Sequence, residues 1–202
     1  MSKQMIISIS REYGSGGHEI AKKLSERLGV SFYDRNMLDD IAKYMNVDVD
    51  NLHKYDEKRK KPIISRTVRG HSNSPEEIIA EIQFNYLRNK AETGESFVVV
   101  GRCAEQVLHD YPGMIPIFIL GDEDEKSKRI QMIRNVTASE ALSIMARHDK
   151  TRKAYHNSHC SNKWGDSRGY EISINSSKLG IEHTVNLLLD FIKIRMEINE
   201  NN

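Results

Sequence analysis

A glycine-rich loop separates an apolar run from a helix-patterned stretch near the start of the sequence. The run MIISIS, residues 5–10, alternates like a strand, and REYGSGG follows it directly. After the loop, Ile20, Leu24 and Leu28 recur with helical spacing. A strand, a glycine loop and a helix in this order form the usual phosphate cradle, because glycine lets the backbone approach a ligand and the helix start offers free N–H groups. A tight turn that binds nothing has the same pattern, so the glycines alone leave both interpretations open.

Two standard phosphate-loop templates can be compared with this segment. The dinucleotide fingerprint G-x-G-x-x-G, counted from Gly14, requires a glycine where Glu19 stands, so it fails. The Walker A template G-x-x-x-x-G-K-[ST] fits in length over residues 11–18, with Gly16 as its second glycine. Its first glycine, its lysine and its hydroxyl residue are replaced by Arg11, Gly17 and His18. The backbone half of the cradle is kept, but the side chains that reach the β- and γ-phosphates are lost.

The missing lysine means that the charge facing a bound polyphosphate must come from another side chain. Arg11 and Lys22 are the nearest basic residues in the sequence. A lysine one turn further along a helix normally lies at the surface, so we predict that Arg11 is the replacement cation.

Strand-like and helix-like segments alternate along the rest of the chain. Further strands are predicted at residues 30–33, 97–100, 115–120 and 170–175, with helices at 17–28, 36–45, 74–92, 122–134, 138–154 and 181–198. This alternation predicts an α/β fold with a doubly wound parallel sheet of about five strands flanked by helices. Ligands bind at the carboxyl ends of the strands in such sheets. Both the glycine loop and the pair Gly101-Arg102 follow a predicted strand, so both are candidates for a binding site.

Composition indicates a single soluble domain spanning residues 1–202 and argues against several classes of function. The net charge of +1 argues against a dedicated nucleic-acid binder. No window approaches the roughly 20 apolar residues of a membrane span. Cys103 and Cys160 are the two cysteines and give no disulfide framework, so we expect a cytoplasmic protein. The oligomeric state stays open.

Residues 46–73 interrupt the regular pattern. They are polar and contain the basic run KRKK at 58–61. One interpretation is a solvated loop, and the other is a mobile basic flap over an anionic ligand. We expect a flexible segment within the single domain.

Later motifs, taken with the glycine loop, resemble those of the cytidylate kinase-like family of P-loop kinases. The resemblance covers about residues 5–192 and rests on five pieces in order: ISISREYGSGGHEIAKKLSERLG, FYDRNML, VVVGRCAEQVL, IPIFILGDEDEKSKRI, and RHDKTRKAY followed by WGDSRGYEISINSS. It implies a three-layer α/β/α P-loop fold with a helical lid at about residues 147–169. It also implies transfer of the γ-phosphoryl group of ATP, with Mg2+, to a nucleoside monophosphate such as CMP or dCMP.

The resemblance also assigns roles to residues by position. The donor phosphates would be surrounded by Gly14, Ser15, Gly16, Gly17 and His18. The acceptor side, which includes the segment 46–73, would be formed by Asp34, Arg35 and Asp149. The resemblance would place Arg102 on the acceptor phosphate and Arg147 and Arg152 in the lid. With Arg11, predicted from its place beside the loop, these three arginines would be the catalytic cations. The loop near the donor base would contain Asn175 and Ser176.

Departures from the family pattern leave other functions open. Val100 and Cys103 replace the acids that flank Gly-Arg, and FYDRNML lacks the familiar acceptor-side serine, tyrosine and arginine. These changes weaken the case for cytosine specificity. A kinase of another small metabolite, a nucleotide-binding regulatory module without catalysis, and a generic anion-binding protein are the alternatives.

Several of these residues also have a purely structural interpretation. Asp34 is a favoured helix cap. Arg147, Asp149 and Arg152 have the spacing of an exposed, salt-bridged helix. The segment HNSHC, residues 156–160, and the nearby His148 suggest metal ligands, but their spacing does not repeat that of structural zinc sites, so we assign no metal.

Overall fold

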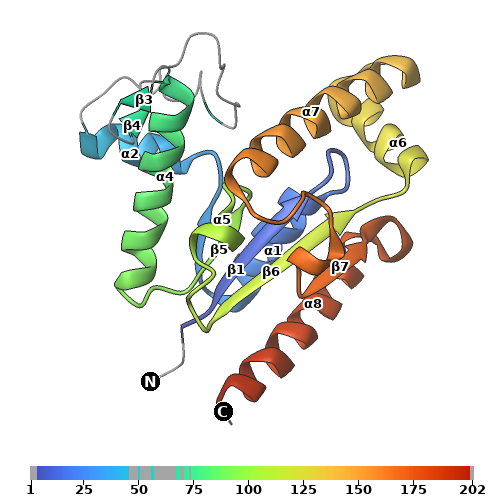
Figure 1. The fold of residues 1–202 in the computed structure, drawn as a ribbon. Coiled ribbons are helices and arrows are strands. Elements are labelled where there is room, and N and C mark those ends of the chain that lie inside the picture. The colour runs from blue at the N-terminus through green and yellow to red at the C-terminus, as the bar shows by residue number, and fades with distance from the viewer. Residues whose placement is uncertain are drawn as a thin grey trace.

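The computed structural model describes residues 4–45, 50, 56, 67–68, 71–72 and 74–200. Its centre is a parallel sheet of five strands in the order β2-β5-β1-β6-β7 (Figure 1). The strands are β1 (Ile6–Arg11), β2 (Ser31–Tyr33), β5 (Phe97–Val100), β6 (Met114–Leu120) and β7 (Ile172–Asn175). The predicted doubly wound α/β fold is confirmed.

β1 is the central strand, and the chain order reverses there. β2 and β5 lie on one side of it, and β6 and β7 lie on the other. Ligand sites of open α/β sheets form at such a reversal, outside the carboxyl ends of the strands. The glycine loop begins at this place.

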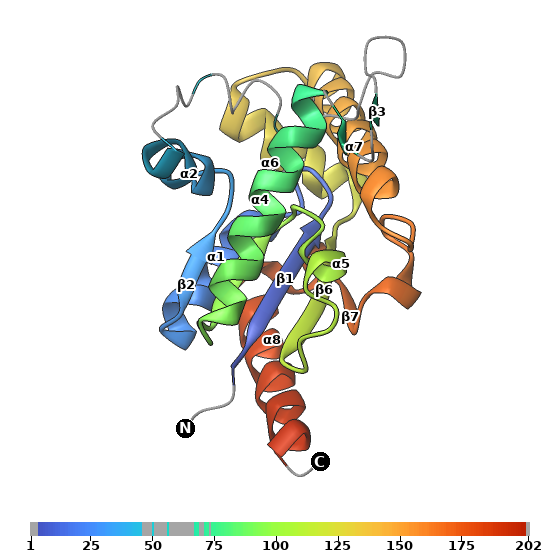
Figure 2. The same cartoon turned by 60° about the vertical axis from the view of Figure 1, so that its left-hand side comes forward.

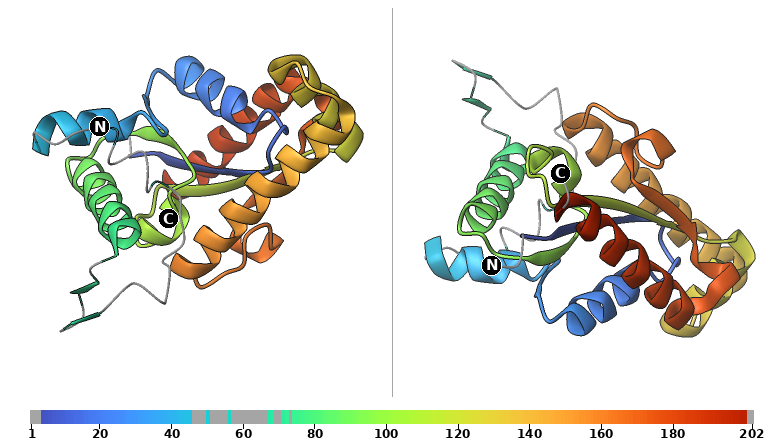
Figure 3. Two further views of the ribbon diagram at one scale, coloured as in Figure 1. Left: turned by 90° about the horizontal axis from the view of Figure 1, so that it is seen from above. Right: turned by 90° about the horizontal axis from the view of Figure 1, so that it is seen from below.

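Helices cover both faces of the sheet (Figure 3). One face carries α1 (Gly17–Leu28) and α8 (Ser176–Glu200), and the other carries α4 (Pro75–Glu92) and α5 (Ala104–Val107). The alternation of β1 matches these layers, because successive side chains of a strand point to opposite faces. Ile7 and Ile9 pack with α1 and α8, and Ile6 packs on the opposite side. On that opposite side the hydroxyl groups of Ser8 and Ser10 donate to Glu105 of α5.

Three more helices lie around the carboxyl ends of the strands (Figure 2). They are α2 (Met37–Met45), α6 (Glu123–Arg134) and α7 (Ala138–His159). A capping box starts α7, because Thr137 Oγ1 accepts the Glu140 N–H while the Glu140 carboxylate accepts the Thr137 N–H. The predicted end of this helix at Ala154 is too early, since Tyr155 and His156 are buried and extend the packed face. α8 leaves helical geometry once, at Gly180 (φ 71°, ψ 172°), so its regular part starts where the sequence predicts it.

Of the segment 46–73, the structure describes only residues 50, 56, 67–68 and 71–72. β3 (Thr67–Val68) pairs there with β4 (His71–Ser72) in an antiparallel arrangement. The prediction that this segment is flexible falls mainly outside the described residues. In the predicted lid, the end of α7 is followed by a connecting stretch and the short 3-10 helix Ser167–Gly169.

Both ends of the described chain lie at the amino end of β1, on the side away from the glycine loop (Figures 1 and 2). Throughout the described part of the chain, every helix is too short or too polar to cross a membrane.

Candidate functional site

The glycine loop turns the chain from β1 into α1 through two residues with left-handed backbone, Gly14 (φ 87°) and Gly16 (φ 77°). A Cβ on Gly16 would also displace the end of the Ile181 side chain, but the positive φ is the stronger reason for glycine here. The loop is held from beneath by the Ser176 hydroxyl, which donates to the carbonyl oxygen of Ser15 at 2.6 Å. The backbone of the cradle is therefore fixed by the surrounding protein.

Gly17 opens α1 in direct contact with the end of β1. A Cβ on Gly17 would lie 2.6 Å from Arg11 Cβ and 3.3 Å from Ile119 Cβ, atoms that are tied to the sheet. We expect Gly17→Ala to displace the loop or Arg11, at a cost of about 1–3 kcal/mol in unfolding free energy. Because the sequence predicts that this loop holds donor phosphates, we expect the displaced loop to bind ADP about tenfold more weakly, which titration calorimetry would measure.

Gly29→Ala, at the other end of α1, is the matched control for this prediction. Its new Cβ meets no atom within 4 Å, although φ is +66°. We expect a loss of about 1–2 kcal/mol from backbone strain and an unchanged ADP affinity. Equal ADP affinities for the wild type and Gly17→Ala would show that the loop does not hold the nucleotide.

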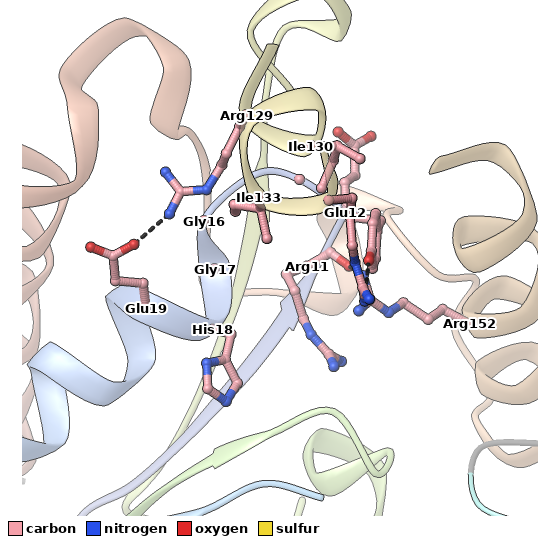
Figure 4. Close-up of a pocket in the computed structure, with 13 residues that line it drawn as sticks. Arg11, Glu12, Gly16, Gly17, His18, Glu19, Arg129, Ile130, Ile133 and Arg152 are labelled. Atoms are coloured by element: carbon pink, nitrogen blue, oxygen red, sulfur yellow. Dashed lines mark hydrogen bonds and ion pairs between the residues drawn. The ribbon is translucent and has the colours of Figure 1, made fainter. Parts of the chain in front are cut away.

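A pocket of about 430 Å3 opens beside the glycine loop (Figure 4). Its volume lies within the range of small-molecule sites, about 300–1,000 Å3. Basic side chains outnumber carboxylates in its lining. The basic residues are Arg11, His18, Arg129, Arg134 and Arg152, and the acidic residues are Glu12 and Glu19. This excess of positive charge suits an anionic ligand such as a polyphosphate.

Arg129 reaches the loop from α6. A Cβ on Gly16 would lie 3.5 Å from Arg129 Cζ, so the guanidinium stands over the loop glycine. It forms an ion pair with Glu19 on the first turn of α1 (Figure 4). Sequence reasoning did not select Arg129 as a site residue. The available signal is its position in the helix that follows β6, the strand next to β1.

A second cation of α6 has a different role. Lys126 Nζ lies 2.7 Å from Glu12 Oε2, and the Gly121 N–H donates to the same oxygen at 3.2 Å. The ion pair holds α6 against the loop. Because Glu12 neutralises the Lys126 ammonium group, the positive charge that faces the pocket comes from the arginines.

Arg152 reaches the loop from α7 on the other side (Figure 4). Its Nη1 donates to the carbonyl oxygen of Arg11 at 3.2 Å, and its guanidinium carbon lies 5.3 Å from the centre of the Tyr13 ring. Asp149 Oδ1 accepts the Tyr13 N–H at 2.7 Å and lies 3.7 Å from Arg152 Nη1. Burial raises the pKa of Asp149. The middle of α7 is thus attached to the glycine loop.

β2 is followed by a buried carboxylate that contacts the pocket wall. Asp34 Oδ2 lies 2.7 Å from His18 Nε2, and Asp34 Oδ1 accepts the Asn36 N–H at 2.8 Å. The hydrogen bond with His18 holds the pKa of Asp34 below its usual value. Asp34 therefore shapes the turn into α2, as a capping role predicts, and also contacts a residue that lines the pocket.

The end of β5 has an unusual backbone. Gly101, Arg102 and Cys103 have φ values of 75°, 62° and 53°, although residues with side chains rarely adopt this region. Such strain is found mainly at functional sites. Arg102 is 2% exposed, and its Nη2 lies 2.9 Å from Asp56 Oδ2. Arg35 is exposed, and its Nε lies 3.6 Å from the same oxygen.

A smaller pocket of about 20 Å3 lies between the ends of β1 and β5 and the helix α7. Arg11, Arg102 and Arg152 all line it. Arg11 and Arg152 also line the larger pocket, so these two arginines separate the glycine loop from the buried Arg102.

Comparison with known proteins agrees with this geometry. The sequence profile of the Cytidylate kinase-like family matches residues 6–178. The chain belongs to the cytidylate kinase-like family. The membership supports a small-molecule kinase. No curated protein is similar to the chain at a significant level.

Solved structures similar to this cytidylate kinase-like protein span nearly its whole length. An uncharacterized protein from Eubacterium ventriosum ATCC 27560 is 40% identical with a TM-score of 0.75, covering 94% of this chain and 99% of its own. A shikimate kinase from Bacteroides thetaiotaomicron is 15% identical with a TM-score of 0.56, and the match covers 94% of this chain and 98% of the shikimate kinase chain. A shikimate kinase from Acinetobacter baumannii, solved in complex with shikimate, is 12% identical with a TM-score of 0.54, covering 95% and 94%. The two shikimate kinases share the fold.

Some residues predicted for this cytidylate kinase-like protein lie outside the two pockets. Arg147 is exposed on α7 and lines neither of them. Asp149, which the resemblance assigns to the acceptor, lies instead at the glycine loop, because the helical rise of α7 brings it beside Tyr13. Asn175 Nδ2 donates to Asp122 Oδ1 at 2.7 Å, so with Ser176 it supports the loop and the start of α6.

Proposed function

We propose that the protein transfers the γ-phosphoryl group of ATP to a nucleoside monophosphate of the CMP or dCMP type. The observation that carries the proposal is the shared lining of the two pockets by Arg11 and Arg152. A donor in the larger pocket and an acceptor phosphate at Arg102 would meet at these two guanidinium groups. This is where negative charge is concentrated during an in-line transfer.

Each basic side chain has a separate role in the proposed reaction, according to the phosphate group that it faces. The glycine loop and Arg129 hold the donor phosphates, in place of the missing Walker lysine. Arg102 orients the acceptor phosphate, whose oxygen attacks the γ-phosphorus while the bond to the β–γ bridging oxygen breaks and ADP leaves. Arg11 and Arg152 stabilise the charge on the transferring group, since guanidinium forks fit phosphate oxygens well.

Mg2+ is the expected metal of such a reaction and prefers oxygen ligands. His18 replaces the hydroxyl residue that usually contacts it, so the nearby carboxylate of Asp34 and the phosphates themselves would hold the ion. When bound, Mg2+ would neutralise charge on the donor phosphates.

A kinase of a small hydroxylated metabolite is the second candidate. The buried Asp34 favours it, because a carboxylate beside the loop can accept a hydrogen bond from an attacking hydroxyl group. The shared fold of the shikimate kinases makes shikimate a natural member of the test panel.

A coupled assay of ADP release with ATP and Mg2+ tests both candidates. The acceptor panel contains CMP, dCMP, UMP, AMP, GMP, shikimate and several sugar acids. We expect turnover at about 1–100 per second with one cytidine monophosphate and far less with the other acceptors. Turnover only with a hydroxylated acid would favour the second candidate.

Binding measurements separate the remaining outcomes. Calorimetric binding of ADP without turnover on any acceptor would overturn the kinase proposal in favour of a regulatory nucleotide-binding module. Binding of inorganic phosphate or sulfate without preference for nucleotides would favour a generic anion-binding protein.

A further inference from the structure

Three side chains with metal-binding atoms converge on the face of the sheet that carries α5, outside the larger pocket and beside the smaller one. They are Glu105 of α5, His156 of α7 and Cys160, the residue that ends α7. We call them the Glu105–His156–Cys160 group. One ligand atom from each lies within 4.8 Å of the others, and His156 Nε2 is 2.9 Å from Glu105 Oε1. None of the three lines the larger pocket.

The distances within the group suit a tetrahedral metal site. Zinc bonds of about 2.0–2.3 Å to nitrogen, oxygen and sulfur place the ligand atoms about 3.3–3.8 Å apart. The separation of 2.9 Å between His156 Nε2 and Glu105 Oε1 has to widen by about half an ångström on the same reasoning, and the Cys160 sulfur starts within 4.8 Å of both atoms. A cavity of about 40 Å3, lined by all three residues, adjoins the group. It provides room for a water molecule as the fourth ligand.

Surrounding residues hold the ligand side chains in place. The Ser8 and Ser10 hydroxyls donate to the Glu105 carboxylate at 2.9 Å and 3.2 Å. His156 Nδ1 lies 3.4 Å from Asn157 Oδ1, a contact that leaves Nε2 directed at the group. The Ser8 hydrogen bond goes to Glu105 Oε2, and the Ser10 hydrogen bond goes to Oε1, the oxygen beside His156. Hydrogen bonds to ligand side chains are a regular feature of protein metal sites, because they fix the orientation of the ligands.

We propose that the Glu105–His156–Cys160 group binds one divalent ion of the zinc class. The ligand atoms indicate the kind of metal ion, since a thiolate and an imidazole favour zinc or cobalt over Mg2+. On binding, the Cys160 thiol and the His156 Nε2–H, which points at the Glu105 carboxylate, release their protons to solvent, and the freed sulfur and nitrogen coordinate the ion. The ion would connect the residues after the buried Arg102 to the end of the lid helix.

The structure corrects the pattern visible in the sequence. His148 stacks on Tyr13, with ring centres 4.2 Å apart, and belongs to the loop side of α7. His159 packs against the rings of Phe84 and Tyr155 and lies outside the group. The third ligand, Glu105, comes from a helix more than fifty positions earlier in the chain, so spacing within HNSHC could not reveal it.

Cobalt substitution tests the proposal on the full chain. The protein is purified with a phosphine reductant, stripped with a chelator, dialysed, and titrated with Co2+ and then Zn2+. We expect one equivalent of metal per chain, a thiolate-to-cobalt absorption band in the near ultraviolet, and its loss when Zn2+ displaces Co2+. Saturating Zn2+ should raise the Tm by about 5 °C or more, as expected for a ligand at about 100 times its Kd.

Variants then assign the ligands independently of turnover. Cys160→Ser should lose the near-ultraviolet band, and His156→Gln should bind at least tenfold more weakly. His159→Gln is the matched control and should retain one equivalent and the full band. Substoichiometric metal in the wild type, no thiolate band, or a band that persists in Cys160→Ser would overturn the proposal. The wild-type spectrum decides the matter even where a variant fails to fold.

Discussion

Arg152→Gln is expected to lower kcat by about 10²–10³-fold while changing the KM for ATP much less. Arg152 Nη1 lies 3.2 Å from the carbonyl oxygen of Arg11, and Arg152 lines both pockets, so in the proposed reaction its guanidinium would face the transferring phosphoryl group. An interaction that strengthens as charge develops affects kcat more than ground-state binding. Steady-state kinetics with the acceptor identified by the panel assay measure the effect. Arg152→Lys keeps the positive charge but loses the planar guanidinium that binds two oxygens at once. Its kcat should therefore lie between those of the wild type and Arg152→Gln.

Arg147→Gln is the matched control on the same helix. Sequence reasoning assigns Arg147 and Arg152 equal roles in the lid, but the structure places Arg147 on the exposed face. We expect Arg147→Gln to keep kcat within about twofold of the wild type, as for surface substitutions in general. Equal losses in the two variants would contradict the assignment that the structure supports. Thermal unfolding of each variant confirms that the fold is retained.

Arg102→Met is expected to lower the unfolding free energy by about 3–5 kcal/mol, because it removes the buried guanidinium partner of the Asp56 carboxylate and leaves only the exposed Arg35, 3.6 Å away. The Arg102 and Asp56 side chains are 2% and 6% exposed, and their charged atoms lie 2.9 Å apart. A loss of that size lowers the Tm by about 10 °C in a domain of this length. Chemical denaturation and calorimetry measure it. Turnover should also be lost, since Arg102 is proposed to hold the acceptor phosphate.

The double variant Arg102→Met with Asp56→Asn separates the two roles of Arg102. Asparagine removes the buried negative charge and keeps an oxygen that can accept the hydrogen bond of Gln83 Nε2, which lies 3.0 Å from Asp56 Oδ1. We expect most of the stability to return while turnover stays low. Recovery of both properties would show that Arg102 has a structural role only.

The sequence predicts the elements of the fold well because their signals are local. The wholly apolar FVVV run becomes β5, and Gly29 ends α1 in a left-handed conformation, both at the expected residues. The main error concerns the end of α7, which reaches His159 because Tyr155 and His156 are buried against distant elements. Such tertiary contacts do not appear in the local pattern of residues.

The site could be predicted from the sequence only in part, for the same reason. The glycines of the loop and Arg11 are adjacent in sequence, and the structure brings them to one pocket. Arg129 comes from a helix more than a hundred residues later and reaches Gly16 only through the order of β1 and β6 in the sheet. Asp149, assigned by the resemblance to the acceptor, contacts the loop at Tyr13, because its direction depends on how α7 packs, which spacing alone does not determine.

The position of the two chain ends has a practical consequence for experiments on this protein. Both ends of the described chain lie at the amino end of β1, and the glycine loop lies at its carboxyl end. A tag, a surface tether or a fused fluorescent reporter attached at either end would leave the larger pocket facing the solution. Immobilised protein should therefore bind nucleotides with the same affinity whichever end is anchored.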